Sequence, residues 1–136
     1  MIKIAGAIAT NAMKNLLLNR AFKTSPDNGA YVSGAIGTSA VNPVAGDTAL
    51  GTVISGWNSG SDYKGYESGS PTFDTTNRRV STRMFVSSTQ ANSNTITEYV
   101  DVNGDGTPTI GGRFVFTGIA KTSNIQIFIK PTYRMI

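Results

Sequence analysis

The fold of this chain is decided by residues 95–130, which read T-I-T-E-Y-V-D-V-N-G-D-G-T-P-T-I-G-G-R-F-V-F-T-G-I-A-K-T-S-N-I-Q-I-F-I-K. Apolar and polar residues alternate on both sides of N-G-D-G at 103–106, and the dipeptides N-G and D-G are strong hairpin-turn signals. Near the end of the stretch, Ile125, Ile127 and Ile129 fall on one face of a third extended segment. The pattern predicts an antiparallel hairpin followed by another strand.

The same alternation occurs earlier in the chain. Residues 79–86 alternate with a period of two and place four residues on one face, namely Val80, Thr82, Met84 and Val86. Residues 30–37 form another predicted strand, and short segments rich in Gly, Asn, Asp and Pro separate the strands. This spacing predicts an all-β protein, an antiparallel β-sandwich of jelly-roll or immunoglobulin-like type, with 1–136 as a single domain.

One helix is predicted, near the N-terminus. Thr10 or Asn11 is suited to cap it, and the four residues on its apolar face are Ala12, Met13, Leu16 and Leu17. A helix of about ten residues depends on tertiary packing for its stability. Residues 1–9 are expected to form an edge strand or an extended arm, and Pro26 and Gly29 mark a turn after the helix.

Residues 55–77 are rich in Gly and Ser and predict a long loop or a pair of irregular edge strands. This segment also holds four aromatic residues, Trp57, Tyr63, Tyr66 and Phe73. Three interpretations stay open for them: packing of the loop on its own domain, contact with another protein, or stacking against a sugar. They are the candidate contact residues of this chain.

The composition excludes several classes of chemistry. The 136 residues include no Cys and no His, so disulfides, thiolate nucleophiles and histidine metal ligands are all ruled out. The net charge of +4 comes from dispersed basic residues, apart from Arg78, Arg79 and Arg83. We expect these three arginines to be solvated or paired between subunits, and nucleic-acid binding is the less favoured alternative. The apolar runs are far shorter than the roughly 20 residues of a membrane span, and the N-terminus is not a convincing signal peptide.

A partial calcium-loop motif overlaps the hairpin turn. Asp101, Asn103 and Asp105 supply oxygen side chains at positions one, three and five, and Gly106 follows at position six. Position twelve is Gly112, where a calcium loop requires a bidentate Glu. The motif is therefore interpreted first as a hairpin turn and only second as a weak calcium site.

The acidic residues do not form a recognisable catalytic pair. Glu98 and Asp101 are three residues apart on a predicted strand and should point to opposite faces. Asp62 and Glu67 lie within the 55–77 segment, where nothing fixes their separation. The serine nucleophile motif G-x-S-x-G is missing from the sequence. The sequence therefore predicts a protein without catalytic activity or a cofactor.

Several segments taken in order resemble a family. They are T-N-A-M-K-N-L-L-L-N at 10–19, A-I-G-T-S-A at 35–40, D-T-A-L-G at 47–51, N-T-I-T-E-Y at 94–99 and R-F-V-F-T-G-I-A-K-T-S-N-I-Q-I-F-I at 113–129. The second segment is a variant of an "iGtGt" strand end with Ser39 in place of the second Gly. The chain is similar to the small β-rich virion proteins of tailed phages, which occur as head-decoration, tail or fibre-associated components.

This resemblance implies a structural component of a phage particle, made in the host cytoplasm and located on the exterior of the head or tail. Its expected partners are copies of itself and other virion proteins, contacted through terminal arms, edge strands and the aromatic loop. The alternative is a carbohydrate-binding module of a fibre or baseplate that uses the same aromatic residues on a host glycan.

Overall fold

The computed structural model describes residues 8–15, 30–104 and 108–134. These residues form a short helix at 11–15 and ten strands. The strands are β1 (Ile8–Ala9), β2 (Tyr31–Gly37), β3 (Lys64–Gly65), β4 (Thr72–Asp74), β5 (Arg79–Ser81), β6 (Met84–Val86), β7 (Thr95–Asn103), β8 (Ile110–Ala120), β9 (Ile127–Ile129) and β10 (Thr132–Arg134). Every strand pairing is antiparallel, which confirms the predicted all-β class.

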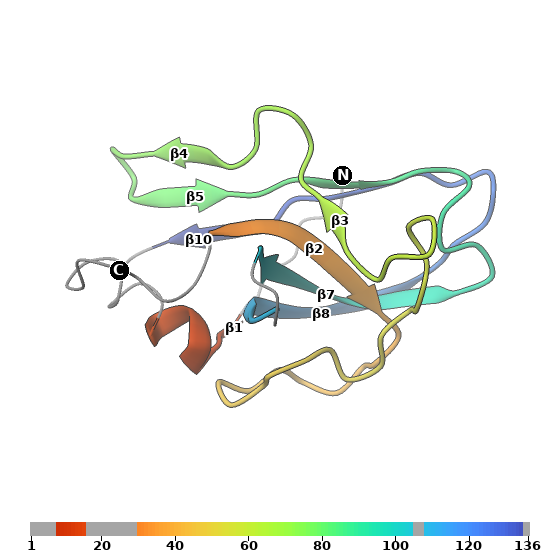
Figure 1. Cartoon of the computed structure of the whole chain (residues 1–136), viewed down its shortest axis with the longest axis horizontal. Helices are drawn as coiled ribbons and strands as arrows, with labels where there is room; N and C mark the ends of the chain where they lie inside the picture. The colour runs from red at the N-terminus through yellow and green to blue at the C-terminus, as the bar shows by residue number, and fades with distance from the viewer. Residues whose placement is uncertain (1–7, 16–29, 105–107, 135–136) are drawn as a thin grey trace.

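The largest sheet has five strands in the order β1-β8-β7-β2-β3. Its centre is the hairpin of β7 and β8, the two longest strands, as the N-G-D-G turn predicts (Figure 1). The backbone N–H of Asn103 donates to the carbonyl oxygen of Thr109 over 3.2 Å and helps to close the hairpin. The register shifts at two places between β7 and β8, between Ile96 and Glu98 and between Val100 and Val102.

Residues 79–86 and 127–134 form one long ladder that runs beside this sheet (Figure 1). The outer half pairs β5 with β10, the inner half pairs β6 with β9, and the register continues between them without a slip. At the junction the Thr82 N–H donates to the Pro131 carbonyl oxygen over 3.2 Å. Proline has no N–H to complete the ladder, so the two halves are separate strands. The prediction of one continuous strand over 79–86 is thus wrong. The predicted alternation of buried and exposed side chains along this segment is right.

This ladder has one buried face and one exposed face. Thr82, Met84, Val86, Ile127 and Ile129 are buried, whereas Arg79, Arg83, Phe128, Lys130 and Arg134 are exposed. The outer half carries β4 as a third strand, in the order β10-β5-β4. Strands with a period of two bury one set of side chains and leave the other in solvent.

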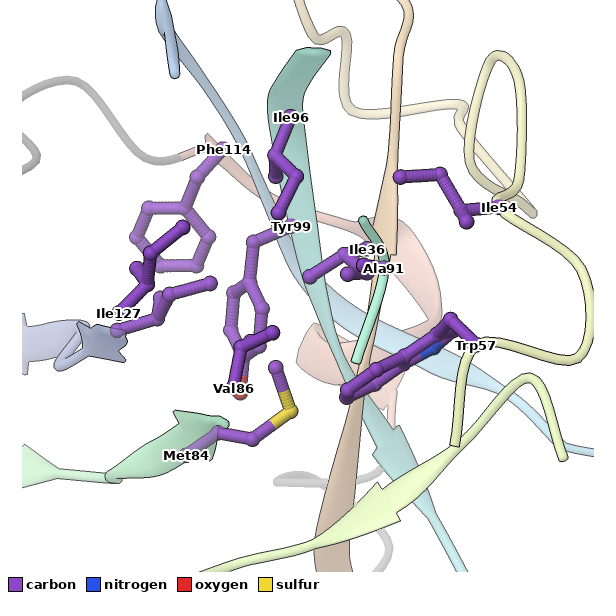
Figure 2. Close-up of a cluster of buried hydrophobic side chains, with 11 residues drawn as sticks. Ile36, Ile54, Trp57, Met84, Val86, Ala91, Ile96, Tyr99, Phe114 and Ile127 are labelled. Atoms are coloured by element: carbon purple, nitrogen blue, oxygen red, sulfur yellow. The ribbon is translucent and has the colours of Figure 1, made fainter. Parts of the chain in front are cut away.

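The main core lies between the five-stranded sheet and the inner half of the ladder. Tyr99 and Phe114 come from the sheet, Met84 and Val86 from the ladder, and all four are at most 1% exposed. Figure 2 shows the Tyr99 ring in the middle of this cluster, with Val86 and Met84 beside it. A second, smaller cluster forms on the opposite face of the sheet, where Leu50 packs against buried Val100 and Val102.

Other expectations are met in part. Thr10 caps the helix, because its Oγ1 accepts from the Met13 N–H over 3.2 Å, but residues 16–29 lie outside the described residues. Ile8–Ala9 is an edge strand, as expected for the N-terminal segment, whereas 1–7 and 135–136 are not described. The 55–77 segment contains β3 and β4, both edge strands.

A two-sheet sandwich and the single-domain assignment of 1–136 stay predictions. No helix in the described ranges is both long enough and apolar enough to span a membrane.

Candidate functional site

The four candidate aromatic residues divide into two buried or partly buried rings and two exposed ones. Trp57 is only 6% exposed, belongs to the main core, and donates from Nε1 to the Asp62 carbonyl oxygen over 2.7 Å (Figure 2). Tyr66 is half-buried and its hydroxyl donates to Asp101 over 2.6 Å. These two residues stabilise the domain itself, which was one of the interpretations open at the sequence level. The structure does not gather the four rings on one surface.

Tyr63 and Phe73 are the exposed members of the set. The Phe73 side chain is 73% exposed on β4, and Tyr63 is 42% exposed beside β3. Tyr63 lines a cleft of about 270 Å³ together with Asp62, Leu50 and Val53. Each of the two exposed rings is therefore a candidate contact residue on a different element of the fold.

Asp101, in β7, is a buried carboxylate that accepts hydrogen bonds from four hydroxyl groups. Tyr66, Thr82 and Tyr99 donate to its Oδ1 over 2.6, 3.0 and 2.7 Å. The Tyr133 hydroxyl donates to Oδ2. None of these four partners is a cation, so within the described part of the chain hydroxyl dipoles stabilise the charge.

Burial dominates the titration of this hydroxyl cluster. Loss of hydration raises the pKa of Asp101, and the four hydrogen bonds act in the opposite direction. Burial, and then the charge of Asp101, raise the pKa values of Tyr99 and Tyr133 well above the ordinary tyrosine value. The same two causes raise the pKa of Tyr31 to about 12. The Tyr31 hydroxyl is buried and has no hydrogen-bond partner among the described residues.

Glu98, three residues before Asp101, is held in a different way. Its carboxylate accepts from the backbone N–H groups of Ser39, Gly51 and Thr52 over 2.8–3.1 Å. Arg113 donates to Glu98 Oε2 from Nε and Nη2 over 3.0 and 2.8 Å. Although burial lowers the pKa of Arg113, the bonds to Glu98 and Asp47 outweigh it and raise that pKa. Glu98 thus ties the 38–52 loop to the sheet.

Two glycines of β2 make room for these clusters. A Cβ at Gly34 would overlap the Tyr99 ring, and a Cβ at Gly37 would overlap the Glu98 carboxylate. Among the described residues, none of the hydrogen-bond partners of Glu98 is also a partner of Asp101. This agrees with the prediction that the two side chains point to opposite faces of the strand.

Two members of the weak calcium candidate are already engaged. Both oxygens of Asp101 accept from hydroxyls, and Asn103 Oδ1 accepts from the Thr109 N–H over 2.7 Å. Asp105 lies outside the described residues. Within the part of the chain that the structure describes, no three His, Cys, Asp or Glu side chains are grouped to hold a metal ion.

A scan against protein-family models and searches of curated proteins and of solved structures found no match to this chain.

One surface was not predicted from the sequence. Arg79 and Arg83 form a local group with Arg78 in the sequence, but the ladder register places Arg134 opposite Arg79 and Lys130 opposite Arg83. The signal was present as a period of two in both segments. What the sequence did not supply was which strand pairs with which.

Proposed function

We propose that this protein is a non-enzymatic structural component of a tailed-phage particle that assembles with copies of itself and with other virion proteins. The observation that carries the proposal is the open edge of β4. This strand is the outer member of its sheet, and its residues Thr72, Phe73 and Asp74 are all exposed.

An open strand edge presents unpaired backbone N–H and C=O groups that can pair with a strand of another chain. Phe73 adds an apolar ring to this edge, and aromatic residues are favoured anchors at protein interfaces. The hairpin of β4 and β5 projects from the body of the molecule in Figure 1, which leaves its outer edge accessible. Strand addition at β4 is thus the contact that this geometry supports best.

The state of the buried acids supports a structural role. Glu98 and Asp101 are fully buried, and their oxygens are bound by backbone, guanidinium or hydroxyl donors of the protein. A catalytic carboxylate must reach its substrate within hydrogen-bond distance. These two carboxylates serve packing and loop attachment instead.

Assembly is tested by measuring molar mass with size-exclusion chromatography and light scattering over a range of protein concentrations. The wild-type protein is expected to form oligomers, and Phe73→Asp should shift the population to monomer because a charge replaces the apolar anchor. Val41→Asp is the matched control, since Val41 is similarly exposed, at 70%, and lies in the 38–52 loop and not in β4. A wild-type protein that stays monomeric alone and with purified phage particles, or oligomers insensitive to Phe73→Asp, would contradict the proposal.

A second candidate function is favoured by the cleft beside Tyr63. An exposed aromatic ring next to a carboxylate can offer a sugar both an apolar face and a hydrogen-bond acceptor. Asp62 Oδ1 is fixed by the Ser55 hydroxyl and the Gly56 N–H over 3.0 and 2.6 Å, so its position is set before any ligand arrives. The alternative function is therefore recognition of a host glycan in this cleft.

A glycan array separates the two functions. Saturable binding that Tyr63→Ala abolishes and Phe73→Ala leaves intact would support glycan recognition in the cleft. If the folded wild-type protein binds no glycan on the array, the assembly role explains the structure better.

A further inference from the structure

The exposed face of the ladder gathers basic residues from two distant parts of the chain. Arg79 lies directly opposite Arg134 in the register of β5 and β10. The same register, carried through the Thr82–Pro131 hydrogen bond, places Arg83 opposite Lys130. At 3.3 Å per residue the two basic pairs are about 13 Å apart along the strands. We call these four residues, Arg79, Arg83, Lys130 and Arg134, the basic stripe.

Like charges directly opposite one another destabilise a sheet. Among the described residues two acids lie next to the stripe: Asp74 of β4 is opposite Arg79, and the Glu67 N–H donates to the Arg83 carbonyl oxygen over 2.9 Å. Both carboxylate oxygens of Asp74 already accept from Asn77. A surface that keeps two like-charged pairs together is suited to a partner with several negative charges.

The stripe leads into an apolar pocket. Arg83, Lys130 and Phe128 line this pocket of about 410 Å³ together with Ile119, Ile125 and Gln126. Phe128 is 40% exposed, stacks on Phe85 with a centroid separation of 4.6 Å, and carries the Arg83 guanidinium 4.2 Å above its ring. The guanidinium thus lies over an aromatic ring in the lining of the pocket, an arrangement that suits stacking as well as phosphate binding.

The position of the stripe argues against a peptide strand as its partner. β5 is the central strand of its sheet, with both edges paired to β10 and β4. A peptide therefore cannot add to β5 by backbone hydrogen bonds, and a partner on this face must be recognised by side chains. Spaced phosphates along a flexible backbone, with flat bases that can enter an apolar pocket, fit that requirement.

We propose that this face binds single-stranded nucleic acid, with phosphates on the basic stripe and a base in the pocket beside Phe128. The spacing of basic residues along the chain does not predict this, because a nucleic-acid surface needs a dense stripe of cations with aromatic residues between them. The fold builds such a stripe from segments that lie about 50 residues apart in the chain.

The test is fluorescence anisotropy of a labelled oligothymidylate titrated with the full-length protein at several salt concentrations. Binding should weaken as salt rises, with a slope of about −3 in a plot of log affinity against log salt for four phosphate contacts. Arg83→Gln should weaken binding about three- to tenfold at low salt and make the slope less steep by about one. Arg134→Gln should behave similarly and gives a second measurement if Arg83→Gln disturbs the stacked Phe128.

Val41→Glu is the matched control, because it changes the net charge by the same amount as Arg83→Gln. Val41 lies in the 38–52 loop, on the other side of the five-stranded sheet from the ladder (Figure 1). Its affinity should equal that of the wild type. The proposal is overturned if oligothymidylate does not bind at low salt, if Val41→Glu is as weak as Arg83→Gln, or if duplex DNA or polyglutamate binds as tightly.

Discussion

Glu98 and Asp101 are two buried carboxylates in one strand, and the protein stabilises them by different means. Glu98 pairs with Arg113 and also accepts three backbone N–H groups of the 38–52 loop. Among the described residues, the donors to Asp101 are all hydroxyl groups. Removing a carboxylate that is paired with a buried cation leaves that cation uncompensated. Removing a carboxylate that accepts hydrogen bonds from hydroxyls leaves only neutral groups behind. The two sites should therefore respond differently to neutralisation.

The largest effect is expected at Glu98. Glu98→Ala leaves Arg113 without its main partner and three backbone N–H groups without an acceptor, so unfolding free energy should fall by about 3–5 kcal/mol. Urea denaturation measures this change. Glu67→Ala is the control from elsewhere in the chain, since Glu67 is half-buried, and it should change stability by less than about 0.5 kcal/mol. Equal losses in both variants would remove the special role of Glu98.

A second large effect is expected at alkaline pH. Tyr31 has an ordinary pKa of 10.0 that the fold raises to about 12, and the pKa values of Tyr66, Tyr99 and Tyr133 are also raised. A raised pKa keeps these tyrosines protonated in the folded state while the unfolded chain ionises. Stability is therefore full below pH 10 and is lost as the pH rises toward 12. Urea denaturation at pH 9, 10 and 11 measures the loss, and a flat profile would contradict it.

A smaller effect is expected for Asp101→Asn. The amide keeps one carbonyl oxygen for the tyrosine hydroxyls and removes a charge that burial disfavours, so the cost should be about 1–2 kcal/mol. Glu98→Gln, compared in the same denaturation series, should cost more because Arg113 stays charged. If Asp101→Asn were the more damaging of the two, the distinction between the sites would be wrong.

The smallest effect is expected for Tyr31→Phe. The Tyr31 hydroxyl is buried without a partner in the described structure, so its removal should stabilise the protein by about 1 kcal/mol. The same variant should show a shallower loss of stability above pH 10. A destabilised Tyr31→Phe protein would indicate that the hydroxyl does have a partner.

The sequence predicted what depends on local pattern. Alternation at 79–86 identified the buried face that holds Thr82, Met84 and Val86, and the N-G-D-G turn identified the hairpin of β7 and β8. Local pattern could not show that Pro131, some 50 residues later, interrupts the ladder opposite Thr82. A strand boundary set by a distant partner is a property of pairing and not of the segment itself.

The candidate contact residues show the same limit. Trp57 stands in a Gly- and Ser-rich segment that suggests exposure, yet the segment folds back and buries the ring in the core. Phe73 stands in similar sequence and remains exposed because β4 ends a sheet. Composition treats the two residues alike, and only the tertiary position of their neighbours separates them. The basic stripe was missed for a related reason, since its members come from two strands.

The continuous register of the ladder has a consequence for how this protein can change. Side chains on a strand switch sides with every residue, so one inserted or deleted residue near Thr82 would turn the rest of the segment over. Arginines would then face the interior while Met84 and Val86 would face water. The segment can thus accept many replacements on its outer side, but its length is fixed, and we expect variation in this region to occur by substitution and hardly ever by a change in residue count.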